Sequence, residues 1–257
     1  MASGPASEDD ALTVSETPLI DLHTHVLPGV DDGARDETEA LAMLAAAARD
    51  GITTIVATPH AHHVRAEQVM AGVERLNAAA RDAGTKITLL PGHEARISAD
   101  LVNRYDDGNL LTLNGTHWLL LECYLFDDWP IHLIERSVDR LRAAGLRPLL
   151  AHAERYPFVQ RDPSALQSLI ERGIPIQVNA GSLFYRETDI ERITAETLLR
   201  TRTAHVIASD AHNARYRPPA LSAAYARAAE ITNDDYAGWM RDVARRVIDG
   251  EEVDLPR

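Results

Sequence analysis

The 257-residue chain has the composition of a globular protein and a strongly acidic charge balance. Hydrophobic residues make up 45% of the chain and charged residues 25%, which is typical of a folded domain in water. The formal net charge of −13 would repel nucleic acid at long range. No run of about 18 apolar residues is present that could span a membrane. Composition therefore argues against a nucleic-acid-binding or membrane-inserted protein.

The single cysteine and the first residues indicate a cytoplasmic protein. Cys123 has no second cysteine to pair with, so no internal disulfide can form. Residues 1–17 are small and acidic, and they lack the basic flank and apolar centre of a signal peptide, so we expect a flexible tail there. No linker or break in composition follows, which predicts one domain over residues 18–257.

Apolar segments alternate with helical patterns along this domain. Strands are predicted at residues 18–23, 52–58, 86–92, 117–122, 147–152, 175–180 and 204–210. Helices are predicted near residues 36–49, 65–83, 131–144, 163–172, 190–201, 218–231 and 234–248. Continuous apolar strands that are separated by helices are typical of a parallel sheet covered on both faces. Seven such units favour a closed or nearly closed barrel.

Six of the seven predicted strands end at a histidine or an acid. In chain order these residues are His23, His25, His60, Glu94, Glu122, His152, Asp210 and His212. In barrels of this kind the carboxyl ends of the strands meet at one mouth, where active sites are built. Asp32, in the first loop, could reach the same mouth.

These nine side chains together point to metal ions. Any one of them alone would be an ordinary structural or surface residue. Nine such groups at one mouth would concentrate negative charge and imidazole nitrogens, which is costly unless cations neutralise them. Each ion takes about four to six ligands, so more than one ion is needed. Nitrogen and oxygen donors without sulfur favour Mn²⁺, Zn²⁺, Fe²⁺ or Co²⁺ over a thiolate-bound metal.

Six short motifs carry a resemblance to a known superfamily. D-L-H-T-H, A-T-P-H, P-G-H-E, L-E, A-H-A-E-R and S-D-A-H, in this order, resemble the PHP (polymerase and histidinol phosphatase) phosphoesterases. The stretches H-V-L-P-G-V-D-D-G-A, G-I-T-T-I-V-A-T-P-H and S-D-A-H-N…R-P-P are similar to the bacterial capsule-operon phosphotyrosine phosphatases of the CpsB/YwqE type. The resemblance covers about residues 18–231 and implies an α/β fold, a distorted (β/α)7 TIM-like barrel.

The resemblance also implies a site with three divalent ions, for which Mn²⁺ is favoured and Fe, Zn, Co or Mg is an alternative. The ligands would divide into three sets: His23, His25, Glu94 and Asp210; Glu94, Glu122 and His152; and Asp32, His60 and His212. Arg155 and Arg217 match family arginines that hold the substrate phosphate and stabilise the transition state. The departure at Ala153, where the family usually has proline, leaves His152 and Arg155 in place.

The implied activity is that of a metal-dependent protein-tyrosine phosphatase. A hydroxide that bridges the metal ions would attack phosphotyrosine on the tail of a bacterial kinase that controls capsular or exopolysaccharide synthesis. The alternative on the same fold is a small-molecule phosphomonoesterase of the histidinol-phosphatase type. A nuclease is disfavoured by the acidic charge, and a non-enzymatic regulator by the complete ligand set. A cysteine phosphatase would need arginine six residues after Cys123, where the chain has Trp129.

Several further side chains are candidates for supporting roles. Asp21 lies on the histidine side of the first predicted strand, so we expect it to accept an imidazole N–H. His62, His63 and His93 are candidates for a general acid or for outer contacts. Aromatic side chains in loops after strand ends either form a wall for an aromatic substrate or pack those loops onto the barrel; these are Trp129, Phe158, Phe184 and Tyr185.

Overall fold

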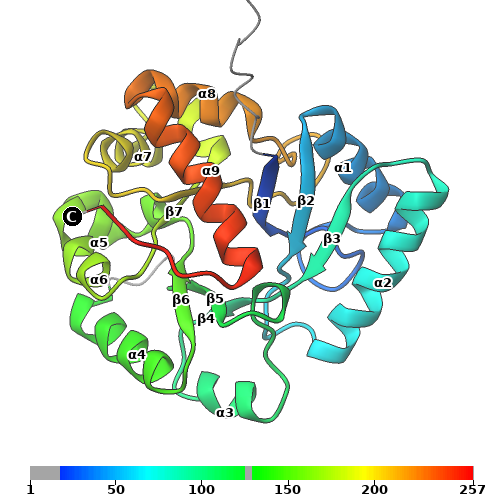
Figure 1. The fold of residues 1–257 in the computed structure, drawn as a ribbon, viewed down its shortest axis with the longest axis horizontal. Coiled ribbons are helices and arrows are strands. Elements are labelled where there is room, and N and C mark those ends of the chain that lie inside the picture. The colour runs from blue at the N-terminus through cyan, green and yellow to red at the C-terminus, as the bar shows by residue number, and fades with distance from the viewer. Residues whose placement is uncertain (1–17, 125–128, 257) are drawn as a thin grey trace, which may run out of the picture.

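Short parallel strands alternate with helices in the computed structural model, which describes residues 18–124 and 129–256 (Figure 1). The described strands are β1 (Leu19–Thr24), β2 (Ile52–Ala57), β3 (Thr88–Pro91), β4 (Glu94–Arg96), β5 (Trp118–Glu122), β6 (Arg147–Leu150), β7 (Gln177–Asn179) and β8 (Val206–Ala208). Each predicted strand region contains a strand, and the fold is mixed α/β as expected. The tail predicted over residues 1–17 lies outside the described residues.

The helices follow the predicted order with two additions. They are α1 (Glu37–Arg49), α2 (Ala66–Asp82), α3 (Leu101–Asp106), α4 (Ile131–Ala143), α5 (Pro157–Arg161), α6 (Gln167–Glu171), α7 (Ile190–Arg200), α8 (Ser222–Ile231) and α9 (Asp234–Asp249). The short helices α3 and α5 were not predicted. Helix α8 begins four residues later than predicted, because Pro218 and Pro219 favour extended backbone before them. None of the described helices is long and apolar enough to cross a membrane.

The described strands form three small parallel sheets, in the orders β1-β2-β3, β4-β5-β6 and β7-β8. Isolated bridges link neighbouring sheets: Thr24 to Ala211, His60 to Glu94, and Leu150 to Ile176. The predicted third strand corresponds to β3, which pairs with β2, and the segment after Gly92 forms a further strand, β4, which was not predicted and pairs with β5. A closed seven-stranded barrel is therefore not confirmed.

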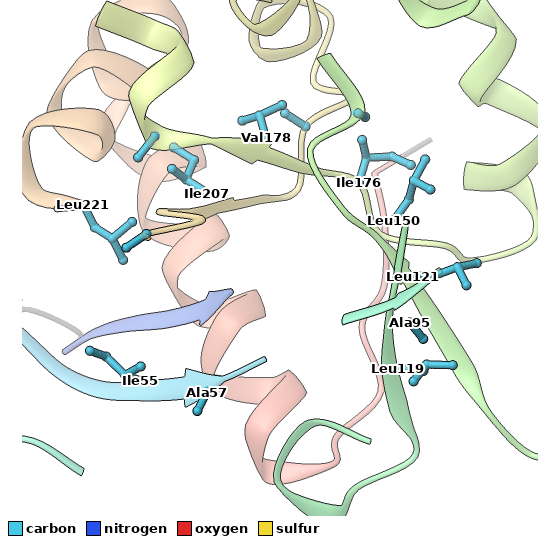
Figure 2. Close-up of a cluster of buried hydrophobic side chains, with 14 of the residues drawn as sticks. Ile55, Ala57, Ala95, Leu119, Leu121, Leu150, Ile176, Val178, Ile207 and Leu221 are labelled. Carbon is cyan, nitrogen blue, oxygen red and sulfur yellow. The ribbon is translucent and has the colours of Figure 1, made fainter. Parts of the chain in front are cut away.

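Buried side chains of the strands pack on two faces. On β5, Leu119 and Leu121 belong to a large cluster between strands and surrounding helices, part of which Figure 2 shows. The alternate residues Trp118 and Leu120 belong to a smaller cluster, as expected when successive side chains point to opposite faces. Every residue of β5 is buried, which explains its continuous apolar sequence.

Helix α9 closes the amino ends of the strands. Its apolar side chains Val243, Ala244 and Val247 join the smaller cluster, which includes the first residues of β5 and β8. The segment after α9 continues this cover, since Trp118 Nε1 donates to the carbonyl of Glu251 at 3.1 Å. In Figure 1 the helix lies across the middle of the molecule, over the strands. Helix α9 does not cover the carboxyl ends of the strands, where the candidate site lies.

Replacing Leu120 by Ala should lower the free energy of unfolding by about 2–5 kcal/mol, because a cavity is left at a fully buried position. The same change at Leu133, which is exposed on α4, should cost at most about 1 kcal/mol. Urea unfolding followed by circular dichroism measures both values. Equal losses in the two variants would contradict the buried position of Leu120.

Candidate metal centre

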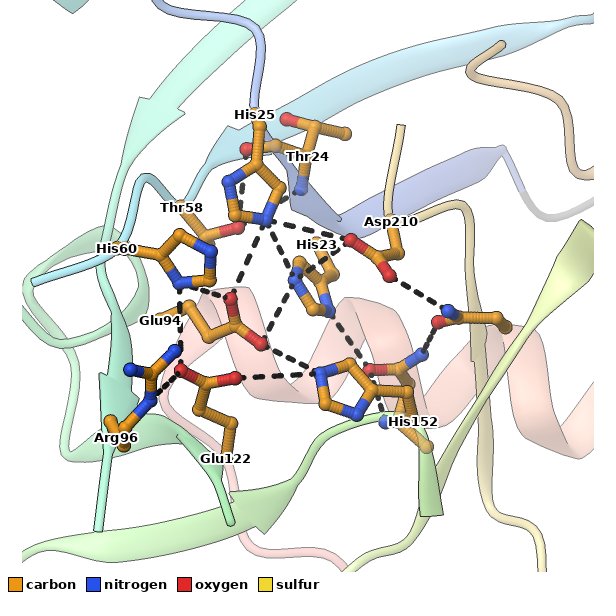
Figure 3. Close-up of polar contacts among 12 residues, drawn as sticks. His23, Thr24, His25, Thr58, His60, Glu94, Arg96, Glu122, His152 and Asp210 are labelled. Carbon is orange, nitrogen blue, oxygen red and sulfur yellow. Dashed lines mark hydrogen bonds and ion pairs between the residues drawn. The ribbon is translucent and has the colours of Figure 1, made fainter. Parts of the chain in front are cut away.

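The carboxyl ends of the strands bring all nine predicted ligands to one place. Figure 3 shows imidazoles and carboxylates from β1, β4 and β5 and from the segments after β1, β2, β6 and β8 pointing toward one another. Within the described residues, four groups of donors lie close enough to hold an ion, with ligand atoms within 4.8 Å of one another. The groups are His23, His25 and Asp210; His23, Glu94 and His152; His25, Asp32 and His212; and His25, His60 and Glu94.

The two histidines of the D-L-H-T-H motif form the deepest part of the centre. Nε2 of His23 lies 3.2 Å from Nε2 of His25, and both side chains are fully buried. Asp210 Oδ1 lies 3.5 Å from each of these nitrogens. Glu94 offers Oε1 to His23 at 3.4 Å and Oε2 to His25 at 3.5 Å. Imidazole nitrogens and carboxylate oxygens therefore alternate around one small space.

The proton positions on His23 follow from its neighbour Gln177. Gln177 Oε1 accepts the backbone N–H of His152 at 3.1 Å, and its Nε2 donates to Asn179 Oδ1 at 2.7 Å. These contacts fix the amide with its oxygen toward His23 Nδ1, 3.1 Å away. Nδ1 of His23 must then carry a proton, which it donates to Gln177.

His25 has the same arrangement, because its Nδ1 donates to Asp31 Oδ2 at 2.7 Å. When both rings are neutral, the Nε2 lone pairs of His23 and His25 face one another. Two such acceptors 3.2 Å apart repel unless a proton or a cation lies between them. This geometry, with carboxylates on either side, fits a divalent cation bound by nitrogen and oxygen donors.

Glu94 occupies the middle of the cluster. Its Oε1 lies 2.8 Å from Nε2 of His152, and its Oε2 lies 2.9 Å from Nδ1 of His60. The His60 nitrogen is buried and has no hydrogen bond to any described residue, so the contact with Glu94 lacks hydrogen-bond geometry. Glu122 lies 3.6 Å from His60 and 3.9 Å from His152. Glu94 is therefore placed to share its two oxygens between ions.

The centre opens to solvent at Asp32, whose side chain is 61% exposed. Its Oδ1 lies 3.5 Å from Nε2 of His60 and 3.4 Å from Nε2 of His212. The loop that carries Asp32 folds back on β1, with Ala34 N–H donating to the His25 carbonyl at 3.0 Å. A Cβ at Gly33 would lie 1.9 Å from that carbonyl oxygen, so only glycine fits there.

The two predicted arginines lie beside the cluster and contact Asp210. Asp210 Oδ2 accepts hydrogen bonds from Asn179 Nδ2 at 2.8 Å and from Arg155 Nη1 at 3.3 Å. Nη2 of Arg217 lies 2.6 Å from the same oxygen. Because Oδ1 faces the imidazoles, Asp210 joins the candidate ion-binding centre to both guanidinium groups. His152 and Asp210 also have left-handed backbone, with φ of 31° and 51°, which is uncommon outside glycine.

The pKa shifts of the buried acids indicate which carboxyl groups the cluster keeps ionised. Burial by itself raises the pKa of Glu94, but the charge of His23 and hydrogen bonds from His152 and His23 hold it well below its usual range. Burial and the neighbouring charge of Glu94 instead raise the pKa of Glu122 to about 7. For Asp210, the positive charges of His23 and Arg217 outweigh burial and lower the pKa.

His25 takes up a proton that a cation would displace. Burial lowers its pKa, but hydrogen bonds to Asp31 and Glu94 outweigh burial and hold the pKa well above its usual value. Without metal ions, protons on imidazoles therefore neutralise part of the carboxylate charge. Bound cations would do the same more completely.

Four residues with contacts in this centre were not predicted. Asp31 was passed over for its neighbour Asp32, although it hydrogen-bonds to His25 and to the backbone N–H of His60. Gln177 and Asn179 come from β7, the one predicted strand without a histidine or an acid at its end. Arg96 Nε donates to Glu122 Oε1 at 2.8 Å. The contact between Arg96 and Glu122 could have been found from the pairing of β4 with β5, which places these two residues opposite each other.

The role predicted for Asp21 is wrong. Its Oδ1 accepts the backbone N–H of Ser209 at 3.0 Å and that of His23 at 3.4 Å, rather than an imidazole N–H. Asp21 thus holds β8 against β1. His93 is buried and accepts the backbone N–H of Leu111 at 3.0 Å, while His62 and His63 are exposed.

The structure also shows the burial and contacts of Cys123 and of the four aromatic side chains predicted as a wall. Cys123 is buried, and burial raises the pKa of its thiol, as expected for an unreactive side chain. Phe158 is buried and stacks on Tyr156, and Trp129 stacks on Tyr124. Phe184 and Tyr185 are exposed. The predicted wall is therefore divided between packing residues and exposed ones.

Comparison with known proteins gives a consistent set of relatives. Residues 19–247 match the family described as capsular polysaccharide synthesis, CpsB/CapC. The tyrosine-protein phosphatase YwqE of Bacillus subtilis is 34% identical over 203 residues, which cover 77% of this chain and 79% of the relative. The tyrosine-protein phosphatase CpsB of Streptococcus pneumoniae is 26% identical over 216 residues, 80% of this chain and 88% of the relative.

A solved structure agrees with the sequence comparison. It comes from work on YwqE of Bacillus subtilis and CpsB of Streptococcus pneumoniae, described as unique metal-dependent tyrosine phosphatases. It matches this fold with a TM-score of 0.88 at 29% identity, and the match covers 93% of this chain and 97% of that chain.

Replacing Gln177 by Leu should weaken metal binding by about 10- to 100-fold, because the variant no longer fixes the proton on His23 Nδ1. Titration of the metal-free protein with Mn²⁺ by calorimetry measures the affinity. Gln167, exposed on α6, gives the matched control when it is also replaced by Leu. Equal affinities in the two folded variants would contradict the role of Gln177.

Metal binding near neutral pH should release protons, because the raised pKa of His25 leaves its ring protonated in the metal-free protein. Affinity should fall as the pH is lowered from about 8 to 6, since protons and cations compete for the imidazoles. Calorimetry in two buffers with different heats of ionisation counts the protons. An observed heat that is the same in both buffers would contradict this expectation.

Proposed function

The chain belongs to the CpsB/CapC family of capsular polysaccharide synthesis, and on this basis we propose that it is a metal-dependent tyrosine-protein phosphatase. The observation that carries the proposal is the convergence of nine imidazole and carboxylate side chains, eight of them in groups close enough to hold an ion and Glu122 beside them, next to two arginines. The relatives that support it are named as tyrosine-protein phosphatases, and the matching solved structure is described as metal-dependent.

The proposed ion-binding residues are the nine predicted ligands, and the proposed content is three divalent ions, with Mn²⁺ favoured. Bound there, the ions would supply a hydroxide nucleophile near neutral pH and offset the charge of the phosphoryl group. The mixed nitrogen and oxygen donor set supports this choice of metals. His23 and His25 would present Nε2 to the ions, because their Nδ1 atoms donate to Gln177 and Asp31.

Arg155 and Arg217 would orient the substrate phosphate. A guanidinium group carries five N–H donors in one plane, so an arginine that contacts Asp210 with one nitrogen can offer others to phosphate oxygens. Both side chains are partly exposed, which gives a ligand access to them. Asp210 holds the two guanidinium groups toward one point, and this limits the entropy lost when phosphate binds.

The leaving group of phosphotyrosine needs little help from the protein. A phenol has a pKa of about 10, so phenolate departs far more readily than the alkoxide of serine. An alkyl ester, in contrast, depends much more on a general acid that protonates the departing alkoxide.

The domain organisation, the substrate and the cellular location are also proposals. We propose that residues 18–257 form one domain in which the three bridged sheets make up a distorted barrel. The proposed substrate is the phosphotyrosine tail of a kinase that acts in polysaccharide synthesis, which the capsule-synthesis role of the family supports. A cytoplasmic location would suit this substrate and a chain with one cysteine.

The purified protein loaded with Mn²⁺ should release phosphate from a phosphotyrosine peptide, and a chelator should abolish the activity. Replacing His60 by Ala should lower kcat/KM more than about 100-fold, since even outer contacts of a metal site contribute about 10- to 100-fold. His132, exposed on α4, is the matched control for the same substitution.

Substrate comparison separates the competing functions. Much faster turnover of histidinol phosphate would favour a small-molecule phosphatase, and much faster turnover of an oligonucleotide would favour a nuclease. An unchanged rate in the His60 variant would remove this residue from the catalytic centre.

A further inference from the structure

An apolar cavity lies beside the candidate centre. It has a volume of about 260 Å³ and lies among the 3₁₀ turn Ala180–Phe184, the loop after β8 and the start of α8. Much of its wall is apolar, from Ala180, Phe184, Pro218, Ala220 and Ala223. A cavity of about 150 Å³ is enough to hold benzene in a protein interior. The space therefore suits one aromatic ring.

One wall of this cavity also borders the candidate centre. Asn179 and Arg217 line the cavity, and both contact Asp210 Oδ2, at 2.8 and 2.6 Å. Ser209, the residue before Asp210, lines it as well. In phenyl phosphate a single oxygen separates the ring from phosphorus. A phosphate held by Arg217 next to Asp210 would therefore have its aryl group within reach of this cavity.

The neighbouring pocket, which shares Tyr216 with the apolar cavity, has more charged residues in its lining. It is lined by charged or polar side chains that include Asp32, Arg35, Glu39 and His212. A phenyl ring there would displace water from charged groups without replacing their hydrogen bonds, which is unfavourable. Tyr216 borders both spaces and is 77% exposed. An aryl group of a bound phosphate ester is thus better accommodated on the apolar side.

The aromatic side chains around the cavity support the same choice. Phe184 is 56% exposed, and Tyr185 and Tyr216 are exposed beside it. Rings in this position can stack on an aromatic ligand or meet it edge to face. The loop beneath Tyr216 is well ordered by Asn213, whose Oδ1 accepts the backbone N–H groups of Arg215, Tyr216 and Arg217. The mouth of the cavity is therefore formed before a ligand binds.

We propose that this cavity, the aryl cavity, binds the phenyl ring of the substrate phosphotyrosine and selects aryl phosphates over alkyl phosphates. The inference rests on the proposed phosphatase function and adds a specificity site to it. Arg217 holds the phosphate at one end of the cavity, while Phe184 and the alanines of α8 contact the ring.

The test is a substitution that fills the aryl cavity with a larger side chain from an exposed position. Ala223 lines it and is exposed on α8, so Ala223→Trp adds bulk there without altering the core. Ala226→Trp is the matched control, because Ala226 is exposed on the same helix and is not among the lining residues. Calorimetry with the Mn²⁺-loaded protein measures binding of phenylphosphonate and methylphosphonate, which carry the same acid group and are not hydrolysed.

The wild-type protein should bind phenylphosphonate at least about tenfold more tightly than methylphosphonate, as expected from burial of a phenyl ring. Ala223→Trp should remove most of this preference, measured as the ratio of the two affinities in the same variant, whereas Ala226→Trp should retain the preference. The kcat/KM for a phosphotyrosine peptide should fall in Ala223→Trp and be retained in Ala226→Trp.

Two outcomes separate this inference from the proposed function. Equal binding of the two phosphonates, or a preference that survives in Ala223→Trp, would overturn the aryl cavity while phosphotyrosine hydrolysis continued. Failure of the metal-loaded wild-type protein to hydrolyse phosphotyrosine would overturn the proposed function, and with it this inference.

Discussion

The buried carboxylate of Asp210 is the interaction on which the rest of the site depends. One oxygen faces the Nε2 atoms of His23 and His25, and the other accepts hydrogen bonds from an arginine and an amide. A buried carboxylate is costly unless positive charge and hydrogen bonds surround it, and here both are supplied from opposite sides. The left-handed backbone at Asp210 aims the side chain between these two sets of partners. The candidate ion-binding centre and the two arginines therefore meet at one side chain.

Strand β7 supports the centre without contributing a charged ligand. Gln177 links the His23 ring to the backbone of His152, and Asn179 links Gln177 to Asp210. The backbone of Asn179 is held in turn by Glu154, a fully buried acid whose pKa burial raises to about 7. Such outer contacts fix which imidazole nitrogen faces a metal, and this decides whether a ring can act as a ligand at all. The amides of β7 thus have as large a share in the geometry as the predicted ligands.

Much of the candidate site could be predicted from the sequence, because its candidate ligands follow a simple rule: a histidine or an acid where an apolar strand ends. The rule places His23 and His25 side by side and explains their spacing. It cannot find Gln177, since an uncharged amide inside an apolar strand has no signal until the register is known. The fold was predicted less completely, because pairing of short strands depends on distant contacts. One example is the chain at Gly92, after which β4 joins a different sheet from β3. A Cβ at Gly92 would lie 3.0 Å from the side chains of Leu113 and Val56, which are distant in the sequence.

Closure of the amino ends of the strands by α9 has a consequence for how the protein can change. The apolar contacts of α9, and the hydrogen bond from Trp118 to the segment after it, stabilise one end of the molecule. The histidines, acids and arginines lie at the opposite ends of the strands. The apolar contacts of α9 and the candidate site therefore lie at opposite ends of the strands, so substitutions at one end should act on stability or activity largely independently of those at the other.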